Sequence, residues 1–159
     1  MNQVLKFLDQ QQIKYLVHRH PAVYTCEEAS KHCQGIPGIA SKTLLLRDQK
    51  KQRYFLVIVA ADKRLQLKKL AQHLQVKRLS FASTQSLQEK LKVTPGSVSP
   101  FGLINDPKQT IEVYLDQAVA EAQVVSFHPN DNTATVELSQ KMFQRFLSQV
   151  GHQVKTMQF

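Results

Sequence analysis

The segment from Pro95 to Pro100, PGSVSP, contains residue types that suit a carbonyl-binding loop. Gly96 permits backbone conformations that other residues avoid, and the two prolines fix the backbone angle φ near both ends of the segment. Ser97 and Ser99 are small enough to let a ligand approach the main chain. Clustered backbone N–H groups can then bind a carbonyl or an oxyanion. A plain connector between a helix and a strand has a similar composition, so that alternative stays open on these residues alone.

The other chemistry-bearing residues form no familiar catalytic motif. The sequence has no Walker loop, G-x-G-x-x-G, H-E-x-x-H or G-x-S-x-G. Of six histidines, only His18 and His20 lie close together. Cys26 and Cys33 are seven positions apart with His32 beside one of them, a wider spacing than zinc sites usually have. We therefore expect ordinary reduced cysteines, no metal and no cofactor.

The chain carries a large excess of positive charge. Its 21 Lys and Arg stand against 12 Asp and Glu, which gives a net charge of +9. Many cations cluster at residues 47–53, 63–69 and 77–78. Any single cluster is typical of a solvated face or a hairpin tip, but the total favours a polyanionic partner such as a nucleic acid.

Length and composition indicate a single globular domain over residues 1–159. No apolar run approaches the roughly 18 to 20 residues that a membrane span needs. The amphipathic start of the chain carries Asp9 and lacks the apolar block and cleavage site of a signal peptide. We therefore expect a cytoplasmic protein with no membrane partner.

Hydrophobic periodicity predicts the elements that must position the loop. Helices are expected at 2–12, at 26–33 after a Thr25 cap, around 67–74, after Ser83 or Thr84, and from Ser139 to Gly151. Strands are expected at 14–21, 42–48, 54–61, 110–116, 122–129 and 133–139, with a turn at NDN. The order predicts an α+β fold, with a mixed, largely antiparallel sheet that is curled or closed into a barrel and flanked by helices. The tail after Gly151 gives no signal.

Five blocks of the sequence resemble, in order, the prolyl-tRNA deacylase-like (YbaK-like) aminoacyl-tRNA editing domains. They are HPAVYTCEEA (20–29), KTLLLRD (42–48), LVIVAADKRL (56–65), PGSVSPFGLIND (95–106) and FHPNDNTATV (127–136). The resemblance implies a mixed sheet or barrel with helices, in agreement with the pattern above. It also implies a trans-editing enzyme that hydrolyses the ester of a mischarged tRNA, commonly tRNA(Pro).

The same resemblance implies roles for particular residues. Lys42 matches a functional lysine near the tRNA 3′ end, where its ammonium would hold phosphate or ribose oxygens. Gly96, Ser97, Val98, Ser99 and Pro100 match the G-x-x-x-P loop, whose backbone positions the aminoacyl carbonyl. His128 matches a position near the substrate pocket, and a half-buried histidine at a strand end is its alternative.

The amino acid to be removed stays open. Thr43 resembles the branch that clears cysteinyl-tRNA(Pro), whereas the block at 95–106 resembles the alanyl-type branch. Tyr24, Thr25, Asn105 and Asp106 fall in matching blocks and are candidate substrate-binding residues, although Thr25 could instead cap a helix.

We expect a metal-independent deacylase in which water attacks an ester held by the loop and Lys42. The expected partner is an aminoacyl-tRNA, with a synthetase as a second candidate. The alternative is a non-catalytic module that binds aminoacyl-tRNA or a nucleotide, and turnover of charged tRNA(Pro) distinguishes the two.

Overall fold

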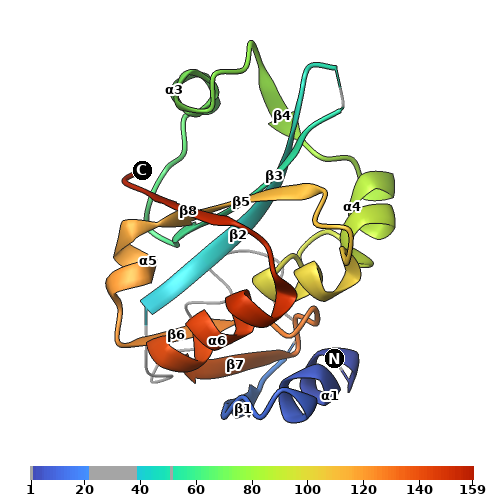
Figure 1. Ribbon diagram of the computed structural model, residues 1–159, viewed down its shortest axis with the longest axis vertical. Coiled ribbons are helices and arrows are strands. Elements are labelled where there is room, and N and C mark those ends of the chain that lie inside the picture. The colour runs from blue at the N-terminus through green and yellow to red at the C-terminus, as the bar shows by residue number, and fades with distance from the viewer. Residues whose placement is uncertain (1, 22–38, 51) are drawn as a thin grey trace.

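The computed structural model describes residues 2–21, 39–50 and 52–159, which form helices packed against a β-sheet (Figure 1). The helices are α1 (Asn2–Gln10), α3 (Leu67–His73), α4 (Thr84–Leu91), the 3-10 helix η1 (Pro100–Asn105), α5 (Gln117–Glu121) and α6 (Gln140–Val150). The strands are β1 (Leu16–Arg19), β2 (Ile39–Asp48), β3 (Tyr54–Ala60), β4 (Leu79–Phe81), β5 (Ile111–Asp116), β6 (Val124–Phe127), β7 (Ala134–Ser139) and β8 (Val154–Met157). None of the helices in the described ranges has the length and apolar content that crossing a membrane requires.

The strands form a mixed sheet in the order β1-β7-β6-β2-β3-β5-β8, with β4 paired to β2 outside that order. The pairs β1–β7, β6–β7, β2–β3 and β2–β4 are antiparallel, and β2–β6, β3–β5 and β5–β8 are parallel. The sequence-based prediction of a mixed, largely antiparallel sheet flanked by helices is therefore confirmed. Within the described chain β1 and β8 do not pair with each other, so the sheet is open and the closed-barrel alternative is not adopted.

Strand β2 joins the two halves of this sheet. Its first residues, Ile39 and Ala40, pair with β6, and the stretch 41–47 pairs with β3. Successive side chains of a strand point to opposite faces. Accordingly, Leu45 lies in the larger hydrophobic core, whereas Leu46 lies in a second core on the opposite face, which α3 covers.

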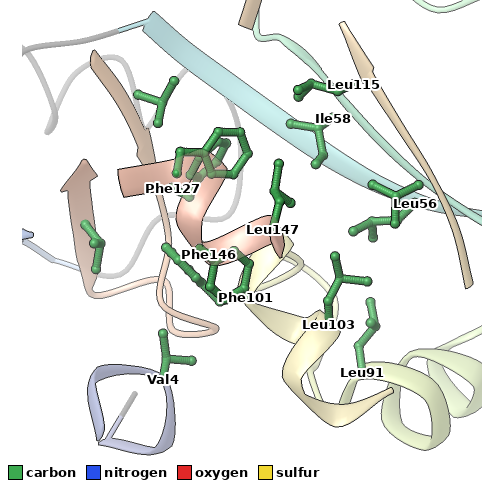
Figure 2. Close-up of a cluster of buried hydrophobic side chains, with 14 of the residues drawn as sticks. Val4, Leu56, Ile58, Leu91, Phe101, Leu103, Leu115, Phe127, Phe146 and Leu147 are labelled. Atoms are coloured by element: carbon green, nitrogen blue, oxygen red, sulfur yellow. The ribbon is translucent and has the colours of Figure 1, made fainter. Parts of the chain in front are cut away.

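The larger core anchors the chain directly after the PGSVSP segment (Figure 2). Phe101 is fully buried, with its ring centroid 5.0 Å from that of Phe146 on α6 and 6.1 Å from that of Phe127 on β6. Burying an aromatic ring of this size contributes about 2–3 kcal/mol. The end of the loop is thereby fixed against both α6 and β6.

Local capping signals in the sequence correctly predicted two helix starts and one helix end. Ser83 accepts a hydrogen bond from the amide of Ser86, and Ser139 accepts one from Met142. Gly151 ends α6 with φ at 77°, a conformation that favours glycine. The helix expected at 26–33 lies outside the described residues. The sequence did not predict β4, η1, α5 or β8.

Candidate functional site

The first half of the loop is a tight turn. The amide of Ser97 donates to the carbonyl of Thr94 at 3.1 Å, and Gly96 has φ at 87°. Pro95 at the second position and a glycine with positive φ at the third are typical of a type II turn. Gly96 is therefore required by backbone conformation, because a side chain there would be strained.

The second half of the loop is held by Ser99, which is almost completely buried. Its Oγ accepts a hydrogen bond from the amide of Phe101 at 3.2 Å and so caps η1. The same hydroxyl donates to Oδ1 of Asn130 at 2.8 Å. Pro100 follows at the first helical position, where its fixed φ suits the helix and its missing N–H is not needed. These contacts join the loop to the turn that follows β6.

The backbone amides of the loop are not equivalent. The Ser97 amide is used within the turn, as described above. The amides of Gly96, Val98 and Ser99 have no acceptor among the described residues. Backbone N–H groups without an internal partner suit binding of a carbonyl or oxyanion. These three amides are therefore the candidate donors of the carbonyl-binding loop.

Lys42 and Thr43 are adjacent on β2 and lie on opposite faces of the sheet. Lys42 is opposite Val59, a residue of the smaller core, and Thr43 is opposite Ile58 in the larger core. Thr43 therefore shares the face against which the loop packs, because Val98 and Phe101 also contact that core. Both side chains are half-buried, and the described residues provide no ion pair for Lys42.

His128 directly follows β6, the strand that pairs with the start of β2. In the parallel pairing of β2 with β6, Ala40 is opposite Ser126. This pairing ends there, because Lys42 pairs with Val59 of β3 and His128 lies one residue beyond the end of β6 at Phe127. The hydrogen bond from Ser99 to Asn130, two residues after His128, ties this segment to the loop, and Lys42 lies two residues beyond the end of the β2–β6 pairing.

The surroundings of His128 favour its neutral form. Burial lowers the pKa of His128, and the nearby His20 lowers it further. Asp131 and the backbone at Ala134 oppose this shift without cancelling it. Its Nδ1 atom is buried and has no hydrogen-bond partner among the residues that the structure describes. A neutral imidazole with a free ring nitrogen can accept a proton or a hydrogen bond.

The sequence did not predict that His20 would neighbour this group. His20 Nδ1 donates to the carbonyl of Pro21 at 2.9 Å, because a carbonyl can only accept. Its Nε2 lies 2.8 Å from Oγ1 of Thr135 on β7. His18, two residues earlier, bonds Glu137 at 3.0 Å. The spacing of two between the histidines was the available signal, since it places both on one face of a strand.

Asn105 and Asp106 hold the chain around the loop through several hydrogen bonds. Asn105 Nδ2 donates to the carbonyl of Leu91 on α4 at 2.8 Å. The carboxylate of Asp106 accepts hydrogen bonds from Thr110, Ile111 and His152. The contact with His152 Nε2 is 2.8 Å long and buried. Both residues are thus engaged in positioning contacts, and no ligand contact is needed to explain their polarity.

Two expected site residues, Tyr24 and Thr25, lie outside the described residues, as do Cys26 and Cys33. Within 2–21, 39–50 and 52–159, no group of three or more His, Cys, Asp or Glu side chains is arranged to hold a metal ion.

Comparison with known proteins gives consistent matches over most of the chain. Residues 20–146 match the model of the aminoacyl-tRNA editing domain family. The "Prolyl-tRNA editing protein ProX" of Acetoanaerobium sticklandii is 38% identical, over 98% of this chain and 94% of its own length. The "Prolyl-tRNA synthetase associated domain-containing protein 1" of Bos taurus is 40% identical, over 88% of this chain and 84% of its own length.

The fold also matches solved structures. One, described as a candidate trans-editing enzyme for prolyl tRNA synthetase, aligns with a TM-score of 0.73. The alignment covers 99% of this chain and 96% of that chain, at 21% sequence identity. At this identity the likeness concerns the fold alone.

Proposed function

The chain belongs to the aminoacyl-tRNA editing domain family, and on that premise we propose that it is a trans-editing deacylase that hydrolyses the ester of mischarged tRNA. One observation carries the proposal. The family match spans residues 20–146, and that span includes Lys42, the Gly96–Pro100 loop and His128. Since the relative from Acetoanaerobium sticklandii is named a prolyl-tRNA editing protein, tRNA(Pro) is the proposed carrier.

The loop acts on the ester carbonyl in this proposal. The amides of Val98 and Ser99 donate to the carbonyl oxygen, and Gly96 allows the substrate to approach the main chain. Donors fixed in place before the reaction stabilise the negative charge that develops on that oxygen. The capping and tethering hydrogen bonds of Ser99 keep these donors rigid.

The chemical step is hydrolysis by water. The water oxygen forms a bond to the carbonyl carbon, and the bond from that carbon to the ribose oxygen breaks. A proton from the water passes to the ribose oxygen, which leaves a free amino acid and an intact tRNA. Lys42 contributes its positive charge to the terminal nucleotide, and orientation supplies much of the rate. No protein nucleophile, metal or cofactor takes part in the proposed reaction.

The proposed amino acids are alanine and cysteine. Binding alone discriminates small apolar side chains by only about 1–3 kcal/mol per methylene, which is why synthetases benefit from a separate hydrolytic step. Thr43 lies on the same face as the loop and is the proposed specificity residue. Tyr24 and Thr25 remain proposed substrate-binding residues from the sequence blocks, and a prolyl-tRNA synthetase is a proposed partner for delivery of the substrate.

The deciding experiment is incubation with tRNA(Pro) carrying labelled alanine, cysteine, serine or proline, followed by loss of the label. We expect release of alanine or cysteine and retention of proline, and we expect Lys42→Ala to slow the release at least tenfold. Binding of every charged tRNA without turnover would favour the non-catalytic module instead. Full activity of Lys42→Ala would contradict the role assigned to that lysine.

A further inference from the structure

One segment of the chain carries positive charge and no acidic residue. Residues 63–88 contain six Lys and Arg and no Asp or Glu. The segment comprises α3, β4 and the first part of α4. Of these, α3 and β4 occur together at one end of the molecule, beside the tip of the β2–β3 hairpin, and α4 lies farther from that end (Figure 1).

Four of these cations form an exposed group. Lys68 and Lys69 project from α3 on the side away from Leu70 and Ala71, which are buried in the smaller core. Lys77 and Arg78 are exposed in the segment between α3 and β4. We call Lys68, Lys69, Lys77 and Arg78 the basic end. Lys63 is excluded from it, because its ammonium is paired with Asp116 at 2.7 Å.

An exposed aromatic ring lies next to the basic end. Phe81 on β4 is 58% exposed, which is unusual for so large an apolar side chain. In the described chain β4 pairs with β2 alone, so its outer edge is open. Cations beside an exposed ring are typical of RNA-binding surfaces, since phosphates contact the cations and a base or ribose packs on the ring.

A hollow adjoins the end of α3. It has a volume of about 680 Å³, and its lining includes Arg53, His73 and Lys155. Arg53 is paired with Glu112 at 2.9 Å, and Lys155 lies over the ring of Tyr114. Because Glu112 offsets the charge of Arg53, the hollow adds mainly the charge of Lys155 to the positive potential of this side of the molecule.

The basic end lies at a distance from the proposed editing site that suits a tRNA. Strand β2 runs from Lys42 to Asp48, next to β4, which is roughly 20 Å at 3.3 Å per residue. In a charged tRNA the ester is on a single-stranded 3′ end, so the duplex of the acceptor arm begins some distance away. A-form duplexes are contacted mainly through phosphates and 2′-hydroxyls, for which exposed cations are suited.

From the charge distribution and this spacing, we propose that the basic end and Phe81 bind the backbone of the tRNA acceptor arm while its 3′ end occupies the site at Lys42. This inference rests on the proposed function, because it takes the substrate from it. It adds the surface that receives the duplex and the direction in which the duplex leaves the site.

The test compares two variants with equal changes in charge. In the first, Lys68, Lys69, Lys77 and Arg78 are all replaced by Gln. In the control, four exposed lysines on other elements, Lys6, Lys14, Lys108 and Lys141, are replaced by Gln. The dissociation constant for uncharged tRNA(Pro) is measured from about 50 to 300 mM KCl. The salt slope is the slope of the logarithm of the binding constant against the logarithm of the KCl concentration, and each lost phosphate contact lowers its magnitude by about one.

We expect the basic-end variant to bind at least roughly tenfold more weakly at low salt and to lose two to four units of slope. The control should lose less than one unit. Phe81→Ala should weaken binding about fivefold or more without changing the slope, because apolar packing of the ring on a backbone ribose releases no counterions. Equal slopes for the basic-end variant and the control would overturn the proposal, and would leave a protein or membrane surface as the partner of this end.

A second measurement separates this inference from the proposed function. A short 3′-aminoacylated CCA oligonucleotide lacks the duplex, so the basic-end variant should hydrolyse it at the wild-type rate while its KM for full-length charged tRNA rises. Absence of hydrolysis by the wild-type protein on both substrates would reject the deacylase function, and the salt slopes would still decide whether the basic end binds RNA. Slower hydrolysis of the oligonucleotide by the basic-end variant than by the control would contradict a role limited to the duplex.

Discussion

Ser99 Oγ donates a hydrogen bond of 2.8 Å to Oδ1 of Asn130, which ties the loop at 95–100 to the turn between β6 and β7. The same hydroxyl accepts from the amide of Phe101 and caps η1. His128 lies two residues before Asn130. One buried hydroxyl therefore determines how the loop amides lie relative to His128, although these segments are about thirty residues apart in sequence.

Replacing Ser99 by Ala should disturb both stability and the proposed reaction. The change removes a helix cap and leaves the amide of Phe101 and Oδ1 of Asn130 without partners, which costs about 1–3 kcal/mol. We expect that loss in urea unfolding, together with a lower kcat and a nearly unchanged KM for charged tRNA. Asn130 has φ at 59°, so Asn130→Gly removes only the acceptor without backbone strain. A wild-type kcat in Asn130→Gly would show that the tether has no part in positioning the loop.

Because Asp106 is hydrogen-bonded to His152 in the fold, the stability of the protein should depend on pH in the acidic range. Burial opposes the charge of Asp106, but hydrogen bonds from His152, Thr110 and Ile111 outweigh it, so the pKa of Asp106 lies below its ordinary value. A lowered folded-state pKa stabilises the fold above the unfolded value of about 3.9, and this stabilisation is lost as pH falls toward the folded value.

Accordingly, Asp106→Asn should destabilise the protein by about 2–3 kcal/mol near pH 7, and the difference from wild type should shrink below about pH 4. Chemical unfolding at a series of pH values measures both effects. A difference that stays constant down to pH 2.5 would contradict the assigned pKa direction. Thr110→Val is a graded control, because it removes one donor to the carboxylate and leaves the charge in place.

Local chemistry made part of the fold predictable from the sequence. Ser83, Ser139 and Gly151 were identified because a cap depends on residues within a few positions of it. The apolar run of β3 was identified as a central strand, since its residues are buried on both faces. The turn at Pro95–Ser97 was foreseeable in the same way, because Pro and Gly each restrict or permit particular φ values.

Features that depend on distant partners were not predictable. The segment 154–157 forms a strand because it pairs in parallel with β5, and no local pattern in the segment predicts this pairing. Asp106 and His152 are 46 residues apart in the sequence, so no local spacing pattern predicts their contact. The opposite orientation of Lys42 and Thr43 follows from strand periodicity, but only the pairing with β3 shows which core each one faces.

Thr43 should influence the choice of amino acid rather than the stability of the fold. It lies on the face of β2 shared with the loop, and its hydroxyl is the proposed contact with the substrate side chain. Thr43→Val removes that hydroxyl, and losing one hydrogen bond corresponds to about a fivefold change in the ratio of rates for cysteinyl- and alanyl-tRNA(Pro). Thr43→Ser keeps the hydroxyl and should keep the wild-type ratio. Identical ratios for the two variants and wild type would exclude Thr43 from the specificity site.

His128 should titrate below an ordinary histidine, and His20 should be part of the reason. Burial and then the nearby His20 lower the pKa of His128, so the folded protein keeps the ring neutral while the unfolded chain takes up a proton near pH 6.5. The fold therefore loses stability as pH falls through about 6.5 toward the folded value, and His128→Gln should abolish that part of the dependence.

The individual pKa can be followed through the ring signals of His128 in an NMR titration. In His20→Gln we expect the pKa of His128 to rise, because one repulsive neighbour is gone, and yet to remain below about 6.5, because burial remains. His18→Gln is the matched control, since His18 lies two residues before His20, within β1, and contacts Glu137 instead. Equal rises in the pKa of His128 in the two variants would indicate a general change in β1 rather than an effect of His20. A pKa of His128 at or above about 6.5 in the wild-type protein would contradict the neutral, proton-accepting state assigned to it.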